Sequence, residues 1–267
     1  MSRLAIVTGA SSGIGEATAL RLAREDGLRI VLVARREERL RALAERIGGG
    51  ATYVAADLTA EDAPARVRAH VEELGEPLGL LVNNAGAGWR GTFADKGWEN
   101  VRRTMEINFN AVLRLTEALL PLLRAAAPSA IVNVSSTAGR VARGGSGAYS
   151  ASKFALAGWS DALYLEERPH GVHVGLVLPG FITTEGFPQA ELNAKWLTRR
   201  MVSTVEVGAE AIVQAGLGGK PERYVPRPYG VAAALRVVAP RLTRRVLGGG
   251  PAQAMTTKTG ADAAEGR

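Results

Sequence analysis

Short runs of aliphatic residues alternate with longer amphipathic stretches along most of this chain of 267 residues. The run Ile30–Val33 is hydrophobic at every position, which is typical of a parallel strand covered on both faces. The stretch after it has the i, i+3, i+4, i+7 spacing of a helix packed on a sheet, at Leu40, Leu43, Ala44 and Ile47. Repeated alternation of this kind predicts a doubly wound α/β fold, with a parallel seven-stranded sheet and helices on both faces.

The expected elements cover the chain up to about residue 226. Strands are predicted at Leu4–Thr8, Arg29–Ala34, Thr52–Ala55, Leu78–Val82, Ala130–Ser135, Val172–Leu178 and Arg223–Val225. Helices are predicted over residues 13–26, 36–47, 61–74, 98–126, 149–168 and 206–217. With no linker before 226, residues 1–247 are expected to form one domain. It would include a substrate loop over 184–205 and a C-terminal helical extension over 229–247, followed by a disordered tail over 248–267.

Charge and cysteine content narrow the classes of partner. Lys and Arg number 33 against 26 Asp and Glu, a formal net charge of +7, and residues 221–267 carry 8 basic and 3 acidic side chains. The excess is therefore concentrated near the C-terminus, and no nucleic-acid partner is expected. The chain has no cysteine and only 3 scattered histidines, so thiolate chemistry is excluded and no metal site is expected. No signal peptide or membrane span is recognisable, and a cytoplasmic location is expected.

A glycine-rich segment follows the first predicted strand and leads into a helix: Thr8-Gly9-Ala10-Ser11-Ser12-Gly13-Ile14-Gly15. Glycines at this G-x-x-x-G-x-G spacing allow a tight turn whose backbone N–H groups approach a pyrophosphate at the helix N-terminus. Such a turn alone is often only structural, but its place at the start of a strand–helix series favours a dinucleotide site. The expected cofactor contacts are Gly9, Ser11, Ser12, Gly13, Ile14 and Gly15.

The end of the second predicted strand bears on the choice of cofactor. An acidic residue there would accept hydrogen bonds from the adenosine ribose, but Ala34 stands in that place and Arg35 and Arg36 follow. Because a guanidinium matches a phosphate in a bidentate fork, NADP(H) is favoured over NAD(H), with Arg35 the preferred ligand and Arg36 the second. The alternative is that both arginines simply begin a solvated helix.

Polar residues also follow the third and fourth predicted strands, at the edge where open α/β sheets bind ligands. Asp57 is expected to face the adenine or, alternatively, to cap the next helix. Asn84, Ala85 and Gly86 are expected to line the cofactor, while an amide of this segment could instead bond the neighbouring strand loops.

A candidate chemical site lies further along the chain. Tyr149 and Lys153 are four residues apart, so they share one face of the predicted helix. The cation is expected to lower the pKa of the Tyr149 phenol and suit it to acid–base catalysis. Ser136, at the end of the fifth strand, could polarise a substrate carbonyl.

These motifs together resemble the short-chain dehydrogenase/reductase family over about residues 3–226, in its single-domain branch. The resemblance implies a Rossmann-like fold and an NAD(P)-dependent enzyme. It makes Tyr149 the proton donor or acceptor, Ser136 the residue that orients the carbonyl, and Lys153 the residue that also holds the nicotinamide ribose. Asn108 would hold a water in a proton relay, and it could also kink the long helix.

The same resemblance extends the cofactor site and implies a homo-oligomer, a dimer or tetramer. Further cofactor contacts would come from Pro179, Gly180, Ile182 and Thr184. The helices 98–126 and 149–168 would form the interface between subunits.

The substrate is expected to be an apolar ketone, aldehyde or secondary alcohol, because apolar residues dominate the segments around the site: Trp89, Phe93, Val141, Phe181, Phe187, Trp196 and Met201. The alternative is a catalytically silent, NADP-binding regulatory or membrane-surface protein of the same fold. The basic, apolar extension over 229–247 is expected to dock on its own domain or on a neighbouring subunit, with contact to an anionic membrane surface as the less favoured alternative.

Overall fold

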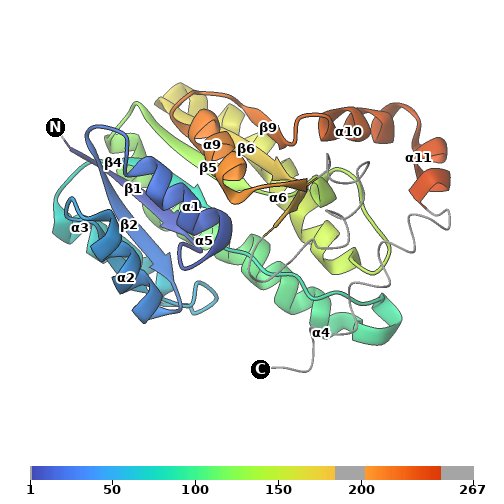
Figure 1. The fold of residues 1–267 in the computed structure, drawn as a ribbon, viewed down its shortest axis with the longest axis horizontal. Helices are drawn as coiled ribbons and strands as arrows, with labels where there is room; N and C mark the ends of the chain where they lie inside the picture. Colours follow the sequence, from blue (N-terminus) through green and yellow to red (C-terminus); the bar gives the residue numbers. More distant parts are fainter. Residues whose placement is uncertain (1, 184–201, 248–267) are drawn as a thin grey trace.

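The computed structural model describes residues 2–183 and 202–247, and its centre is a parallel sheet of seven strands (Figure 1). Their order across the sheet is β3-β2-β1-β4-β5-β6-β9. In chain order the strands are β1 (Arg3–Thr8), β2 (Leu28–Ala34), β3 (Thr52–Ala55), β4 (Leu78–Asn83), β5 (Ser129–Val134), β6 (Val172–Pro179) and β9 (Glu222–Val225). The order reverses between β1 and β4, and a crevice at the carboxyl ends of the strands is expected at such a point.

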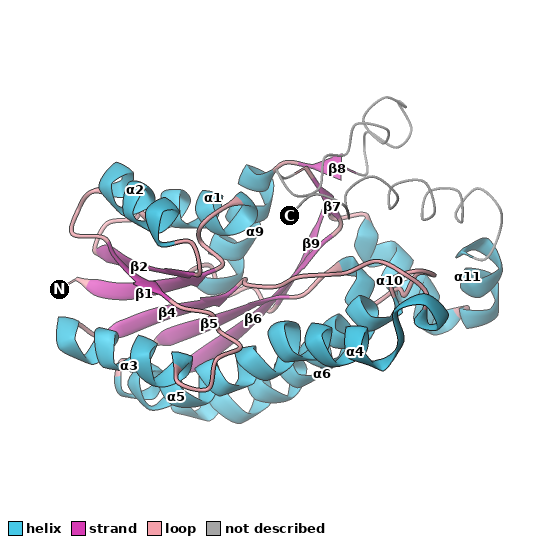
Figure 2. Cartoon of the chain, turned by 90° about the horizontal axis from the view of Figure 1, so that it is seen from below, coloured by secondary structure: helices cyan, strands magenta, loops and turns pink. Residues whose placement is uncertain are grey.

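Helices cover both faces of the sheet, which confirms the predicted doubly wound, Rossmann-like fold (Figure 2). One face carries α1 (Gly13–Leu22), α2 (Glu37–Ile47) and α9 (Val205–Gly216). The other carries α3 (Ala63–Leu74), α5 (Ala111–Ala125) and α6 (Gly147–Glu167), with α4 (Phe93–Met105) packed on α6.

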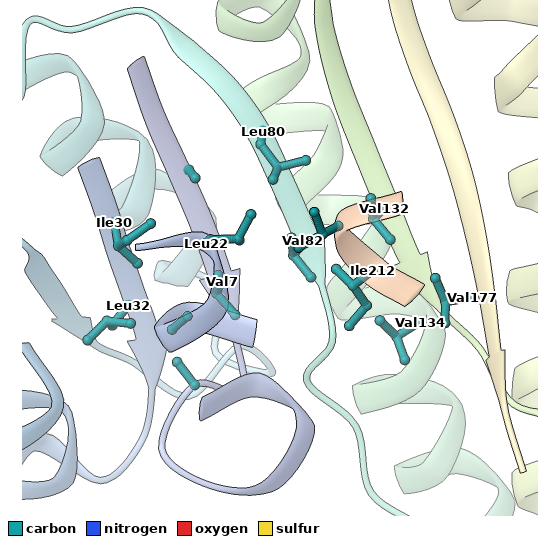
Figure 3. Close-up of a cluster of buried hydrophobic side chains, with 14 of the residues drawn as sticks. Val7, Leu22, Ile30, Leu32, Leu80, Val82, Val132, Val134, Val177 and Ile212 are labelled. Atoms are coloured by element: carbon teal, nitrogen blue, oxygen red, sulfur yellow. The ribbon is translucent and has the colours of Figure 1, made fainter. Parts of the chain in front are cut away.

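The core lies in two layers because neighbouring residues of a strand point to opposite faces. On β1, Val7 packs toward α1 and α9, whereas Ile6 packs toward α3 and α5. Figure 3 shows the first layer, where Ile212 of α9 lies against Val82 and Val132 of the central strands. Each fully buried aliphatic side chain of this kind stabilises the fold by about 1.5–3 kcal/mol. The two hydrophobic layers hold the sheet between the helices. The sheet in turn sets the positions of the strand ends, where the polar residues of the candidate site lie.

The single helix predicted over 98–126 is wrong in its start and its continuity. Thr92 and Asp95 form a capping box that starts α4 at Phe93, and Gly97, with φ of 58°, kinks it. Residues Glu106–Asn110 then form a π-helical turn before α5 begins. A π turn inserts an extra residue into the helix and commonly occurs at functional sites.

The segments after β6 differ from the prediction in two places. First, the predicted loop 184–205 ends before residue 202, because β8 (Val202–Ser203) pairs in parallel with β7 (Phe181–Ile182). Second, α9 starts at Val205, one residue before the predicted helix. Residues 184–201 and 248–267 lie outside the described residues, so the predicted substrate loop and tail stay predictions. No helix of the described chain is long and apolar enough to cross a membrane, and the cytoplasmic location also stays a prediction.

The C-terminal extension forms two helices rather than one, α10 (Tyr229–Val238) and α11 (Pro240–Leu247). Pro240 lacks a backbone N–H, so it breaks the first helix and starts the second. Both lie at the end of the molecule opposite α2 and α3 (Figure 1). Beyond Tyr229, whose ring lies against Gly180, docking on the domain is slight: Ala233 is the buried side chain of α10, and Val237 and Val238 are more than three-quarters exposed.

Candidate active site

The glycine segment between β1 and α1 folds into a turn that only glycine suits. Gly9 and Gly13 have positive φ angles of 66° and 60°, which L side chains rarely adopt. A Cβ on Gly15 would lie 2.2 Å from the Gly9 carbonyl oxygen, so Gly15 is required for packing of the turn. Together with Ser11, Ser12 and other residues, the turn lines a cavity of about 810 Å³ at the carboxyl edge of the sheet.

The predicted residues at the ends of β3 and β4 line the same cavity, at Asp57, Asn84, Ala85 and Gly86. The Asn84 side-chain amide donates to the Thr8 carbonyl at 2.9 Å, which is the bond between strand loops that was the alternative for this segment. Asp57 does not cap α3. It accepts hydrogen bonds from the backbone N–H and hydroxyl of Thr59, and these bonds lower the pKa of its carboxyl group.

Both arginines after β2 line this cavity, in different surroundings. The Arg36 guanidinium donates to the Ser11 hydroxyl at 2.9 Å and to the Ser12 hydroxyl at 2.8 Å. Arg35 lies close enough to Asp57 to lower the pKa of that carboxyl. Arg36, the second choice from the sequence, is therefore the arginine tied to the glycine turn.

Ser136, Tyr149 and Lys153 come together at the end of β5 and the start of α6. The Ser136 hydroxyl and the Tyr149 phenol are hydrogen-bond partners. The Lys153 ammonium lies 5.9 Å from the centroid of the Tyr149 ring and donates to the Val134 carbonyl at 2.9 Å. Ser135, in contrast, donates to the backbone carbonyl of Lys153. The Ser136 hydroxyl is thus the one that faces the phenol.

The electrostatics of this cluster correct one expectation. Burial raises the pKa of Tyr149, opposed by its hydrogen bond with Ser136 and by the charge of Arg143. Burial also lowers the pKa of Lys153 to about 8. The pKa of Tyr149 is therefore raised rather than lowered in this structure, because burial is the largest influence on the phenol and the groups that oppose it are Ser136 and Arg143.

Asn108 is fully buried in the π turn, and its side chain holds the loop after β4. Its amide oxygen accepts from the Ala87 N–H at 2.9 Å, and its NH₂ group donates to the Ala87 carbonyl and the Ser152 hydroxyl. Both the Asn108 oxygen and the Lys153 ammonium lie close beside the Gly86 backbone. The π turn therefore positions the strip of chain that passes the lysine.

Tyr149 faces a second cavity, of about 460 Å³, which shares Ile14, Asn84 and Gly86 with the first. Its lining includes three of the predicted residues at and beyond the end of β6, namely Pro179, Gly180 and Ile182. Thr184 lies outside the described residues.

The predicted apolar lining of this second cavity is present only in part. Trp89 and Phe181 line it, whereas the Phe93 side chain is 72% exposed on α4 and Val141 is not in the wall. Phe187, Trp196 and Met201 lie outside the described residues.

Two cations in the wall of the second cavity, Arg90 and Arg143, were missed from the sequence. Arg90 lies next to Trp89, and Arg143 lies two residues after Val141, but only apolar residues of these segments were singled out from the sequence. The sequence does contain a signal that could have identified them: each arginine is followed by a glycine, which indicates a loop, and each loop lies near a motif of the site. Within the described residues, no group of three or more metal-ligating side chains was found.

Comparison with known proteins is consistent with this geometry. The short chain dehydrogenase family model matches residues 3–194. Ketoacyl reductase HetN from Nostoc sp. is 30% identical over 214 residues, which cover 79% of this chain and 74% of that protein. Glycine betaine reductase ATRR from Emericella nidulans is 37% identical over 187 residues, or 68% of this chain but only 15% of that much longer protein.

A solved structure shares the fold. The crystal structure of a single-residue variant of actinorhodin polyketide ketoreductase with NADPH superposes with a TM-score of 0.77 and 30% identity. The match covers 86% of this chain and 97% of that one. Because the family model spans most of the chain, the chain belongs to the short-chain dehydrogenase/reductase family of NAD(P)-dependent oxidoreductases.

Proposed function

We propose that the protein transfers a hydride between NADP(H) and a carbonyl compound or secondary alcohol. The observation that carries this proposal is the meeting of Ser136, Tyr149 and Lys153 beside a cavity of about 460 Å³ that adjoins the glycine-lined cavity. A volume of this size suits a small-molecule substrate.

The protein's own side chains would handle the proton and the charge. When bound, the nicotinamide supplies the hydride to the carbonyl carbon. In reduction, the Tyr149 phenol donates its proton to the carbonyl oxygen, so that C=O becomes H–C–O–H. The Ser136 hydroxyl donates a hydrogen bond to the same oxygen and stabilises its developing negative charge. Lys153 stabilises the phenolate that is left, and Asn108 acts as a positioning residue through the loop beside Lys153.

The cofactor cavity suits a dinucleotide, because the positive φ angles of Gly9 and Gly13 form a tight turn that lines the cavity at the N-terminus of α1. The expected preference for NADP(H) is part of the proposal. Its support is that Arg35 and Arg36 line the cavity where an acidic residue would select NAD(H). The Arg36 bonds to Ser11 and Ser12 hold a cation beside the turn before any phosphate arrives.

The substrate is proposed to have an apolar carbon skeleton next to its reacting carbonyl, because Trp89 and Phe181 lie in the wall of the Tyr149 cavity. A homo-oligomer is likewise proposed from exposed apolar side chains on α4 and α6, at Trp98, Phe154 and Leu165. Light scattering of the purified protein tests the oligomer.

A Tyr149→Phe variant tests the proposed reaction. Without the phenol proton, carbonyl reduction followed by NADPH oxidation should fall by about 10²–10⁴. Binding of NADPH, followed by its fluorescence, should persist. Turnover that survives the substitution would refute the role of Tyr149. A wild type that binds NADPH but reduces no carbonyl in a panel of graded sizes would instead support the silent regulatory protein.

A further inference from the structure

The helix α10 carries apolar side chains that the rest of the domain does not cover. Tyr229 and Ala233 lie one turn apart on the side that faces the domain, where the Tyr229 ring packs on the cavity wall and Ala233 is buried. Val231, Leu235 and Val238 lie on the opposite side, because a step of two residues turns an α-helix by about 200°. These three side chains, the outer stripe of α10, are between 47% and 76% exposed.

The helix α11 continues this surface and adds charge to it. Leu242 and Val246 are four residues apart, so they share one side of the helix, and both are more than half exposed. The arginines of α11 are also exposed and occupy a different side, at Arg241, Arg244 and Arg245. An apolar side flanked by cations is typical of a helix that lies in a membrane interface.

The charge of the two helices has one sign. Residues 229–247 contain four arginines and no acidic residue. Such a surface matches an anionic membrane, because apolar side chains can enter the boundary between headgroups and acyl chains while arginines contact lipid phosphates. Neither α10, with 10 residues, nor α11, with 8, is long enough to cross a bilayer, so the match is to its surface.

Two other occupants of this face fit its charge less well. A symmetric contact between two copies would bring the arginines of α11 against one another, and the segment has no acidic residue to pair with them. The rest of the chain, residues 248–267, has two basic and two acidic side chains, so it offers no surplus of negative charge. An anionic lipid surface offers negative charge and an apolar layer together.

We propose that α10 and α11 bind the surface of a membrane that contains anionic lipids, and that they hold the protein there as a peripheral protein. The outer stripe of α10 and the apolar side of α11 enter the lipid boundary, and the arginines of α11 bind the phosphates. This contact is independent of the proposed reaction, because Ser136, Tyr149 and Lys153 take no part in it.

Co-sedimentation of the full chain with vesicles tests the proposal. One set of vesicles is phosphatidylcholine alone, and the other contains about one third phosphatidylserine. Leu235→Ser/Val238→Ser removes apolar area from the outer stripe, and Arg241→Gln/Arg244→Gln removes charge from α11. These side chains are exposed, so the variants should fold, and circular dichroism and NADPH fluorescence check that they do.

Two control variants make the same chemical changes elsewhere on the surface. Arg41→Gln/Arg68→Gln removes two exposed arginines that pair with glutamates on α2 and α3, at the opposite end of the molecule (Figure 1). Val207→Ser/Leu217→Ser removes two exposed apolar side chains at α9.

The wild type should bind the anionic vesicles at least about tenfold more tightly than phosphatidylcholine alone, and added salt should weaken this binding. Each variant of α10 or α11 should lower the partition coefficient about tenfold, whereas both controls should leave it unchanged.

Equal binding to the two kinds of vesicle, or binding that survives Leu235→Ser/Val238→Ser, would overturn the proposal. Absence of vesicle binding by the full chain would overturn it as well. A lower mass of Leu235→Ser/Val238→Ser in light scattering would then assign the face to a second copy, and an unchanged mass would assign it to residues 248–267. Each of these results leaves the proposed reaction standing, because NADPH oxidation is measured without vesicles.

Discussion

Replacement of Arg36 by alanine tests the proposed preference for NADP(H) most directly. Its guanidinium already makes two hydrogen bonds with the hydroxyls of Ser11 and Ser12, so it is held beside the turn. A hydrogen bond to a charged group contributes about 1.5–3 kcal/mol, and the exposure of Arg36 places its contribution at the low end. A loss of about 1.4 kcal/mol is a tenfold change in affinity. Arg36→Ala should therefore raise Kd and KM for NADPH about tenfold.

The same substitution should change Kd for NADH less than twofold, because NADH has no 2′-phosphate. Arg41→Ala is the matched control: it removes the same charge from α2, the helix that begins directly after Arg36, but Arg41 bonds Glu37 and lies outside the cavity wall. Fluorescence titration of each cofactor gives Kd, and repetition in higher salt separates direct contact from long-range attraction. An unchanged ratio of the two Kd values in Arg36→Ala, or an equal effect of Arg41→Ala, would refute the assignment. Arg35→Ala, measured alongside, decides which arginine contributes more.

Three further predictions concern the scaffold of the site. Lys153→Met should stabilise the protein by up to about 3 kcal/mol below pH 8, since burial lowers the pKa of Lys153 from 10.5 to about 8. Between pH 8 and 10.5 the Lys153 amine binds a proton only in the unfolded state, so the free energy of unfolding of the wild type rises with pH and the advantage of Lys153→Met shrinks. Denaturant unfolding of both proteins at pH 7 and pH 10 measures this difference. An equal stabilisation by the substitution at the two pH values would contradict the prediction. Gly15→Ala, whose Cβ would meet the Gly9 carbonyl, should weaken NADPH and NADH alike by at least tenfold while circular dichroism still shows a folded chain. Leu115→Ala, at 1% exposure in α5, should lower the free energy of unfolding by about 2–5 kcal/mol, and a cost under 1 would show that the core relaxes around it.

The sheet was predictable because its strands are buried on both faces. Val172 to Leu178, for example, has aliphatic side chains at five of its seven positions, and β6 extends the predicted strand by one residue. The π turn was not predictable, since no local pattern separates a helix with one inserted residue from an uninterrupted one. The buried hydrogen bonds of Asn108 to Ala87, twenty-one residues away in sequence, accompany that turn.

The site was predictable wherever a motif fixes the local spacing. Tyr149 and Lys153 share a helix face by their separation alone, and the glycine turn requires no distant partner. The tyrosine pKa was not predictable in this way, because it depends on burial and on Arg143, which comes from a separate loop. For the same reason the cationic wall of the cavity appeared only once the loops were assembled.

The first residue of the C-terminal extension also builds the site. The Tyr229 ring packs directly on Gly180: a Cβ added to Gly180 would lie 2.4 Å from the ring. The Tyr229 phenol also raises the pKa of Arg143, in opposition to burial. A chain that ends at Val225 would keep every strand of the sheet. It would nevertheless lose the Tyr229 ring that packs on Gly180 in the cavity wall, so a complete sheet is not enough to support the wall of the Tyr149 cavity.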